Sequence, residues 1–415
     1  MHNNAGVLNC SKRNLIPMLL GAALFIGFPC AAQSQEQYEA PPIFRAVELL
    51  PKELLKGPQH EVKDRVVNDG YMNHYTIESN VGVFRADSNA ELRIRVQEIY
   101  AIVAMDEIRG TAEFAKSFKQ AGANTLRTAK NVVLHPIDTP SGAASGVGRI
   151  FERAGENLFG DPKGETEDRR WKQMVGFSKT KREYAAQFGV DVYSSNQVLQ
   201  EKLDDIAWAG YAGGLSVGIV TMPVGGAAGT ALTALGATKI TNDALRTMPP
   251  ADLRIMNHEK LAAMGVGPSV IELFMLNGAF SPTHQTLLVA ALDEMKGVAD
   301  RDQFVRFAVL SDEEDVALFR QRQAQLYLGY HKSVDRIERF VPVGQLAAAR
   351  TREGHVVFAV PLDYLAWSES MARVIEGTNR VVGHMPGIKE KQLWLAGSLS
   401  PMARQGLEKR GWKIW

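Results

Sequence analysis

Cysteine is almost absent from this chain of 415 residues, because Cys10 and Cys30 are the only two and both lie near the N-terminus. We expect both to be removed with an export signal, which leaves a mature protein without a thiol or a disulfide. This excludes a disulfide scaffold, a cysteine nucleophile, an iron–sulfur cluster and cysteine-ligated zinc. A chain of this size can build a sufficient core without cross-links.

Charge is also scarce at the start of the chain, where Lys12 and Arg13 are the only charged residues before Glu36. An uncharged apolar stretch follows at 15–28, and small residues end it at Cys30-Ala31-Ala32. This order is typical of a secretory signal peptide, so we expect cleavage near Ala32 and export to the periplasm or cell envelope of a bacterium. An uncleaved anchor is the alternative, since about 18 apolar residues just span a bilayer. The near match to a twin-arginine signal leaves the export route open.

An excess of either charge is missing from the whole chain, which has 47 basic and 46 acidic residues. Without the signal peptide the acidic residues exceed the basic ones by one. No nucleic-acid partner is therefore expected. The hydrophobic content of 45% indicates a folded globular protein.

The residue patterns predict an α+β fold in four parts. These are a signal peptide (1–32), a lead-in with a β-meander (33–87), a mostly helical central region (88–337) and a small C-terminal α/β unit (338–415). The turn sequence Asn68-Asp69-Gly70 predicts a hairpin within the meander. Apolar residues at helical spacing predict a helix that begins near Ser88 or Asn89.

Within the C-terminal unit, Ser400-Pro401 predicts a helix start and Gly411 predicts its end. Strands are expected on both sides, at 392–396 and 412–415. Two further helices are expected, one around 44–55 and one near 364–376.

The segment 206–238 contains 33 residues without a charge, and eight of them are glycine. Small residues recur every four positions on each side of Pro223, as is typical of closely packed helices. The members of this pattern are Gly210, Gly214, Gly218, Gly225 and Gly229. The segment is interpreted either as a buried soluble helix pair or glycine-rich loop, or as a helical hairpin that contacts a membrane. The part before Pro223 favours the buried interpretation, because about 17 residues of helix span roughly 25 Å and a hydrocarbon core about 30 Å.

The same segment contains Gly214-Leu215-Ser216-Val217-Gly218, a match to the G-x-S-x-G sequence that exposes a nucleophilic serine in α/β hydrolases. That role requires a buried strand before the serine, whereas 199–209 has a helical pattern. Ser216 is therefore kept only as the catalytic candidate of an alternative function.

Two positions are candidates because of their place in the expected fold. Asp363 follows an expected strand, and ligands often bind where strands of a sheet end. Ser398 and Ser400 lie at an expected helix start, where backbone N–H groups form a seat for an anion. No metal or cofactor is expected, because the nine histidines are scattered and no H-E-x-x-H pattern occurs.

These observations favour an exported envelope protein that binds a ligand or associates with a membrane rather than an enzyme. Its expected partner is an envelope membrane or an envelope protein. A periplasmic serine hydrolase that uses Ser216 is the alternative.

Overall fold

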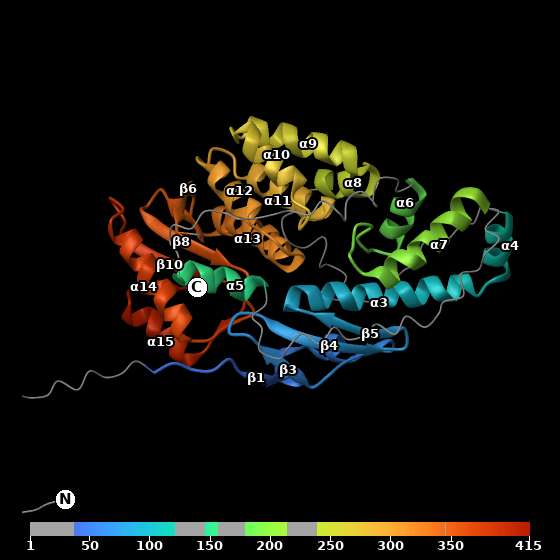
Figure 1. Ribbon diagram of the computed structural model, residues 1–415, viewed down its shortest axis with the longest axis horizontal. Coiled ribbons are helices and arrows are strands. Elements are labelled where there is room, and N and C mark those ends of the chain that lie inside the picture. Colours follow the sequence, from blue (N-terminus) through green and yellow to red (C-terminus); the bar gives the residue numbers. More distant parts are fainter. Residues whose placement is uncertain (1–36, 121–145, 157–178, 214–238, 345) are drawn as a thin grey trace, which may run out of the picture. The chain divides into compact units, whose positions relative to one another are not determined.

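The computed structural model describes residues 37–120, 146–156, 179–213, 239–344 and 346–415. The described residues from Tyr38 to Trp415 belong to one compact unit. Its helices and strands form an α+β fold, as the sequence predicts (Figure 1). The expected signal peptide lies outside the described residues.

The first sheet is the predicted β-meander. Its strands are β1 (Ile43–Arg45), β2 (His60–Val62), β3 (Arg65–Asn68), β4 (Asn73–Ser79) and β5 (Gly82–Ala86). Strand β4 lies at the centre and pairs antiparallel with β2, β3 and β5. The hairpin predicted at Asn68-Asp69-Gly70 joins β3 to β4, with Gly70 at a φ of 99° that glycine adopts readily.

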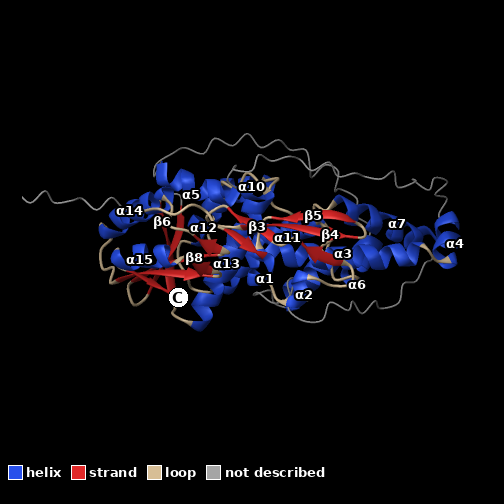
Figure 2. Ribbon diagram, turned by 90° about the horizontal axis from the view of Figure 1, so that it is seen from below, coloured by secondary structure: helices blue, strands red, loops and turns tan. Residues whose placement is uncertain are grey.

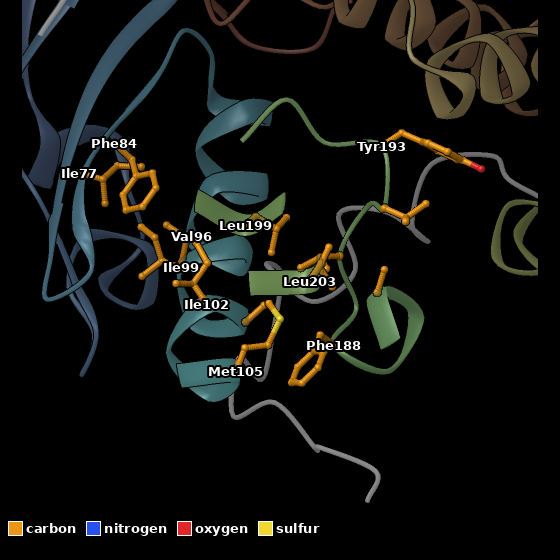
Figure 3. Packing of buried hydrophobic residues seen from close by; sticks show 14 of the residues in the cluster. Ile77, Phe84, Val96, Ile99, Ile102, Met105, Phe188, Tyr193, Leu199 and Leu203 are labelled. Atoms are coloured by element: carbon orange, nitrogen blue, oxygen red, sulfur yellow. The ribbon is translucent and has the colours of Figure 1, made fainter. Parts of the chain in front are cut away.

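Helix α3 (Asn89–Arg109) packs on β4 and β5. It begins where the sequence predicts, because the Ser88 hydroxyl accepts a hydrogen bond from the Glu91 N–H at 3.0 Å. Figure 3 shows the apolar face of α3 between the sheet and α7 (Gln197–Gly213), with Ile99 and Leu203 fully buried at this contact.

The central region is helical, as predicted. Its described helices are α4 (Ala112–Gln120), α5 (Gly146–Glu156), α6 (Lys179–Gln187), α7, α8 (Lys239–Thr247), α9 (Pro250–Ala263), α10 (Pro268–Leu276), α11 (Pro282–Glu294), α12 (Arg301–Val309) and α13 (Glu314–Ser333). Among the described residues, no helix combines the length and the apolar character that a membrane crossing requires.

The second sheet contains β6 (Ile337–Val343), β7 (Leu346–Thr351), β8 (His355–Val360), β10 (Glu390–Leu395) and β12 (Trp412–Ile414), in the order β12-β10-β8-β7-β6. Strand β8 is buried on both faces: Val357 and Ala359 pack with α11–α13, and Phe358 packs on the opposite side with α14 (Glu369–Gly383) and α15 (Pro401–Lys409). Burial on both faces explains why the sequence of β8 is continuously apolar. Figure 2 shows these strands in red among the helices.

Two predicted helices are wrong in their position. The segment expected to be helical at 44–55 instead contains β1 and the short helices α1 (Ala46–Leu49) and α2 (Lys52–Leu55), because Pro51 separates them. The helix expected near 364–376 begins only at Glu369, where Ser368 caps it. The first residues of the expected helix instead form strand β9 (Tyr364–Leu365). This strand pairs with β11 (Ser398–Leu399), which is distant in the sequence.

One buried carboxylate, that of Asp363, connects the first sheet to the second. Its Oδ2 accepts hydrogen bonds from the N–H groups of Asn73 (3.1 Å) and Asn89 (2.8 Å), at the starts of β4 and α3. In the reverse direction, the N–H groups of Asp363 and Tyr364 donate to the Tyr71 carbonyl. Burial raises the pKa of Asp363 to about 6, although the two N–H groups oppose this shift. The candidate from the sequence is therefore a structural acceptor.

We predict that Asp363→Ala destabilises the protein by about 2 kcal/mol, because two partly buried N–H groups lose their acceptor. Asp363→Asn keeps an acceptor oxygen and should recover more than half of this loss. Urea unfolding at pH 7.5 measures both values. Equal losses in the two variants would contradict the role of Asp363 as an acceptor.

Candidate ligand cavity

An apolar cavity lies between the second sheet and the helices α5, α13 and α14. Its interior has about 40 Å³ of free space, and the volume rises to about 560 Å³ when the open mouth is included. Its lining residues are Ile150, Phe151, Phe319, Arg320, Gln323, Leu346, Ala347, Phe358, Val360, Leu362, Leu365, Met371, Val374, Ile375, Thr378, Leu393 and Trp412. The lining is mostly apolar with a few polar groups, as is typical of small-molecule sites.

Local sequence explains how each wall forms. Phe358 and Val360 point to one face of β8 because side chains alternate along a strand. Met371, Val374 and Ile375 lie three and four residues apart and so share one face of α14. Helix α5 packs against α13 and α14 and contributes Phe151 to the lining.

The turn between β3 and β4 supports the α5 wall. The ring of Tyr71 stacks on Phe151 with 4.8 Å between the centroids, and Phe151 meets the edge of Phe319 at 6.1 Å. The carbonyl of Tyr71 is bound by the Asp363 N–H. The hydrogen bonds that connect the two sheets at Asp363 therefore also position the α5 wall of the cavity.

The most unusual residue of the lining is Arg320, whose side chain is charged although only 3% of the residue is exposed. Its NH1 group donates to the Gln323 amide oxygen at 2.9 Å, and its Nε is buried without a hydrogen bond. Gln323 in turn donates to the Ala359 carbonyl at 2.9 Å, which fixes the amide. Across the described part of the chain, Arg320 forms no ion pair with a carboxylate.

Burial lowers the pKa of Arg320 to about 10, because a guanidinium in an apolar wall loses its hydration. A buried cation without a counter-ion destabilises a fold, and an anion that enters the cavity would remove this penalty. The arrangement therefore suits a molecule with an apolar body and one acidic group.

The expected anion seat at Ser398 and Ser400 holds a carboxylate of the chain itself. Ser400 caps α15 by accepting from the Ala403 N–H at 2.8 Å, and its hydroxyl donates to Glu39 Oε1. The same oxygen accepts from the Trp367 N–H at 2.5 Å. Ser398 donates its backbone N–H to the Asp363 carbonyl at 3.1 Å. The hydroxyl of Ser400 and the backbone N–H of Ser398 thus form hydrogen bonds within the protein.

A second buried polar cluster also finds its partners within the chain. Glu98 on α3 is 1% exposed and accepts hydrogen bonds from Arg95, Ser194 and Asn196. These contacts attach α3 to the start of α7. The cluster is therefore assigned to stability rather than to binding.

Most of the glycine-rich segment lies outside the described residues, including Gly214, Ser216, Gly218, Pro223, Gly225 and Gly229. Gly210 is described on α7, where a side chain would collide with the ring of Tyr184 from α6. A small residue is therefore needed for packing at this position. The chain that leads to Ser216 is helical up to Gly213, not the strand that a G-x-S-x-G nucleophile requires.

The end of α7 carries two exposed aromatic residues. Trp208 is 49% exposed and Tyr211 is 69% exposed, and their rings stack at 6.4 Å between centroids. They lie at the start of the uncharged segment.

Sequence reasoning missed the cavity and Arg320. Arg320 lies on α13 among several other polar residues, so the neighbouring sequence does not indicate that its side chain is buried. Comparison with family models, with curated proteins and with solved structures finds no match to this chain.

We predict that Arg320→Met leaves the ligand-free protein at least as stable as the wild type. Methionine has a similar length and fills the same space without a buried charge, so the variant should gain about 1 kcal/mol or more. Arg404→Met, at a half-exposed position on α15, should change stability by less than about 0.5 kcal/mol. Thermal unfolding measures both variants. A loss of 2 kcal/mol or more in Arg320→Met would show that the guanidinium stabilises the empty fold.

Proposed function

We propose that this protein is an exported, non-enzymatic binding protein of the bacterial cell envelope, which takes up an amphiphilic carboxylic acid in the cavity between α5, α13 and α14. The observation that carries the proposal is Arg320, a buried guanidinium that has no carboxylate partner among the described residues and lies in a mostly apolar lining. Export is supported by the basic and apolar pattern of residues 12–32.

The chemistry of the lining favours a carboxylate over a phosphate. A guanidinium binds two carboxylate oxygens through parallel N–H groups and balances a single negative charge. A phosphate monoester brings up to two charges, and Arg320 is the only cation among the described residues that line the cavity. The apolar residues around it suit an alkyl chain or a similar hydrophobic body.

Competition binding tests this proposal. A naturally fluorescent polyene fatty acid serves as the probe, and hexadecanoate, hexadecyl phosphate and hexadecanol serve as competitors. We expect hexadecanoate to compete best, because the headgroup contact with Arg320 is worth about 1.5–3 kcal/mol, or roughly tenfold to a hundredfold in affinity.

Three variants locate the contact. Arg320→Met should lose the preference for hexadecanoate over hexadecanol while it stays folded, and Arg404→Met should bind as the wild type does. Val374→Trp fills the cavity and should weaken all three competitors. An Arg320→Met protein that retains the full preference for the acid would refute the proposal.

Membrane contact is a second candidate function, and the observation that favours it is the exposed pair Trp208 and Tyr211. Tryptophan and tyrosine are the aromatic residues enriched at membrane–water interfaces. The two functions are compatible, since a carrier of an amphiphile must exchange it with a membrane.

Vesicle flotation of the mature protein tests this second function. With vesicles of phosphatidylethanolamine and phosphatidylglycerol, the double variant Trp208→Ala/Tyr211→Ala should float several-fold less than the wild type. The control is Trp415→Ala, which removes an equally exposed tryptophan (49%) elsewhere. Equal flotation of all three proteins would exclude a role for the α7 aromatic pair.

A further inference from the structure

Three side chains with metal-binding atoms meet at the start of β8, away from the cavity lining. Asp335 follows α13, Glu353 lies in the turn between β7 and β8, and His355 begins β8. One ligand atom from each residue lies within 4.8 Å of the others. Histidine nitrogen and carboxylate oxygen together are donors that suit Zn²⁺.

The distance between two of these atoms is informative. Nδ1 of His355 and Oδ2 of Asp335 are 3.5 Å apart, a distance that makes an ion pair when the histidine is protonated but is longer than a usual N–H···O hydrogen bond. Both atoms are buried, and neither has a hydrogen-bond partner. The side chains are only 20% and 18% exposed, so water gives them little compensation.

A tetrahedral zinc ion accounts for this spacing. With metal–nitrogen and metal–oxygen bonds of about 2.1 Å, two ligand atoms at a tetrahedral angle lie about 3.4 Å apart. The exposed carboxylate of Glu353 would then supply a third ligand from the solvent side, and the fourth position would stay open to water.

The surrounding backbone holds these ligands in place. The N–H of His355 donates to the Thr351 hydroxyl at 3.3 Å, and the carbonyl of Gly354 accepts from the Lys389 N–H at 2.9 Å. Gly354 has a φ of 91°, which lets the chain turn tightly between two of the ligands. The two carboxylates also balance the charge of a divalent cation when the histidine is neutral.

We propose that Asp335, Glu353 and His355 form a zinc site that joins the end of α13 to the β7–β8 turn. Helix α13 carries Arg320 and strand β8 carries Phe358, so the ion would fasten two walls of the ligand cavity to each other. The site is independent of the proposed ligand, because none of its three residues lines the cavity.

Isothermal titration of the EDTA-treated, dialysed mature protein with zinc chloride tests the site, and thermal unfolding with and without zinc provides a second readout. We expect one Zn²⁺ per chain and a higher melting temperature with zinc. His355→Ala and Asp335→Asn should each bind zinc at least about tenfold more weakly, since each removes a ligand.

The matched control is His258→Ala, which removes an exposed histidine on α9 and should bind zinc as the wild type does. Melting temperatures without zinc show whether each variant is folded. The proposal is overturned if the wild type binds no zinc, if His355→Ala binds it as tightly as the wild type, or if magnesium chloride gives the same stabilisation as zinc. Because the fatty-acid assay is separate, either proposal can fail while the other stands.

Discussion

The contact between the Asp363 carboxylate and two backbone N–H groups sets the arrangement on which the cavity depends. It attaches the starts of β4 and α3 to the chain that leaves β8, two regions that are far apart in the sequence. The turn before β4 then presents Tyr71, whose ring supports Phe151 on α5. The Asp363 carboxylate therefore fixes the contact between the two sheets. That contact in turn positions the α5 wall of the cavity.

Arg320 explains why such a cavity would be kept. A well-packed apolar side chain at this position would be expected to give a more stable protein, because buried charges without partners are costly. Proteins retain such strained or uncompensated groups mainly where they serve a ligand. Here Gln323 holds the guanidinium from one side, and the apolar lining leaves it without a competing carboxylate among the described residues.

Local patterns predicted much of the fold, and long-range pairing accounts for most of what they missed. The starts of α3 and α15 follow from Ser88 and Ser400, since capping depends on neighbouring residues only. Tyr364–Leu365 was expected in a helix because its strand partner, Ser398–Leu399, is distant in the sequence. The cavity was missed for the same reason. Nothing near Arg320 in the sequence indicates that α5, α14 and the second sheet enclose it.

The most direct test of the account is the molecule that the protein carries when it is purified without detergent. Native mass spectrometry, followed by extraction and identification of the released molecule, measures this. The account predicts one amphiphilic carboxylic acid per mature chain, with little or none on Arg320→Met. A wild-type protein that carries no ligand, or one that carries a neutral lipid equally in both forms, would contradict it.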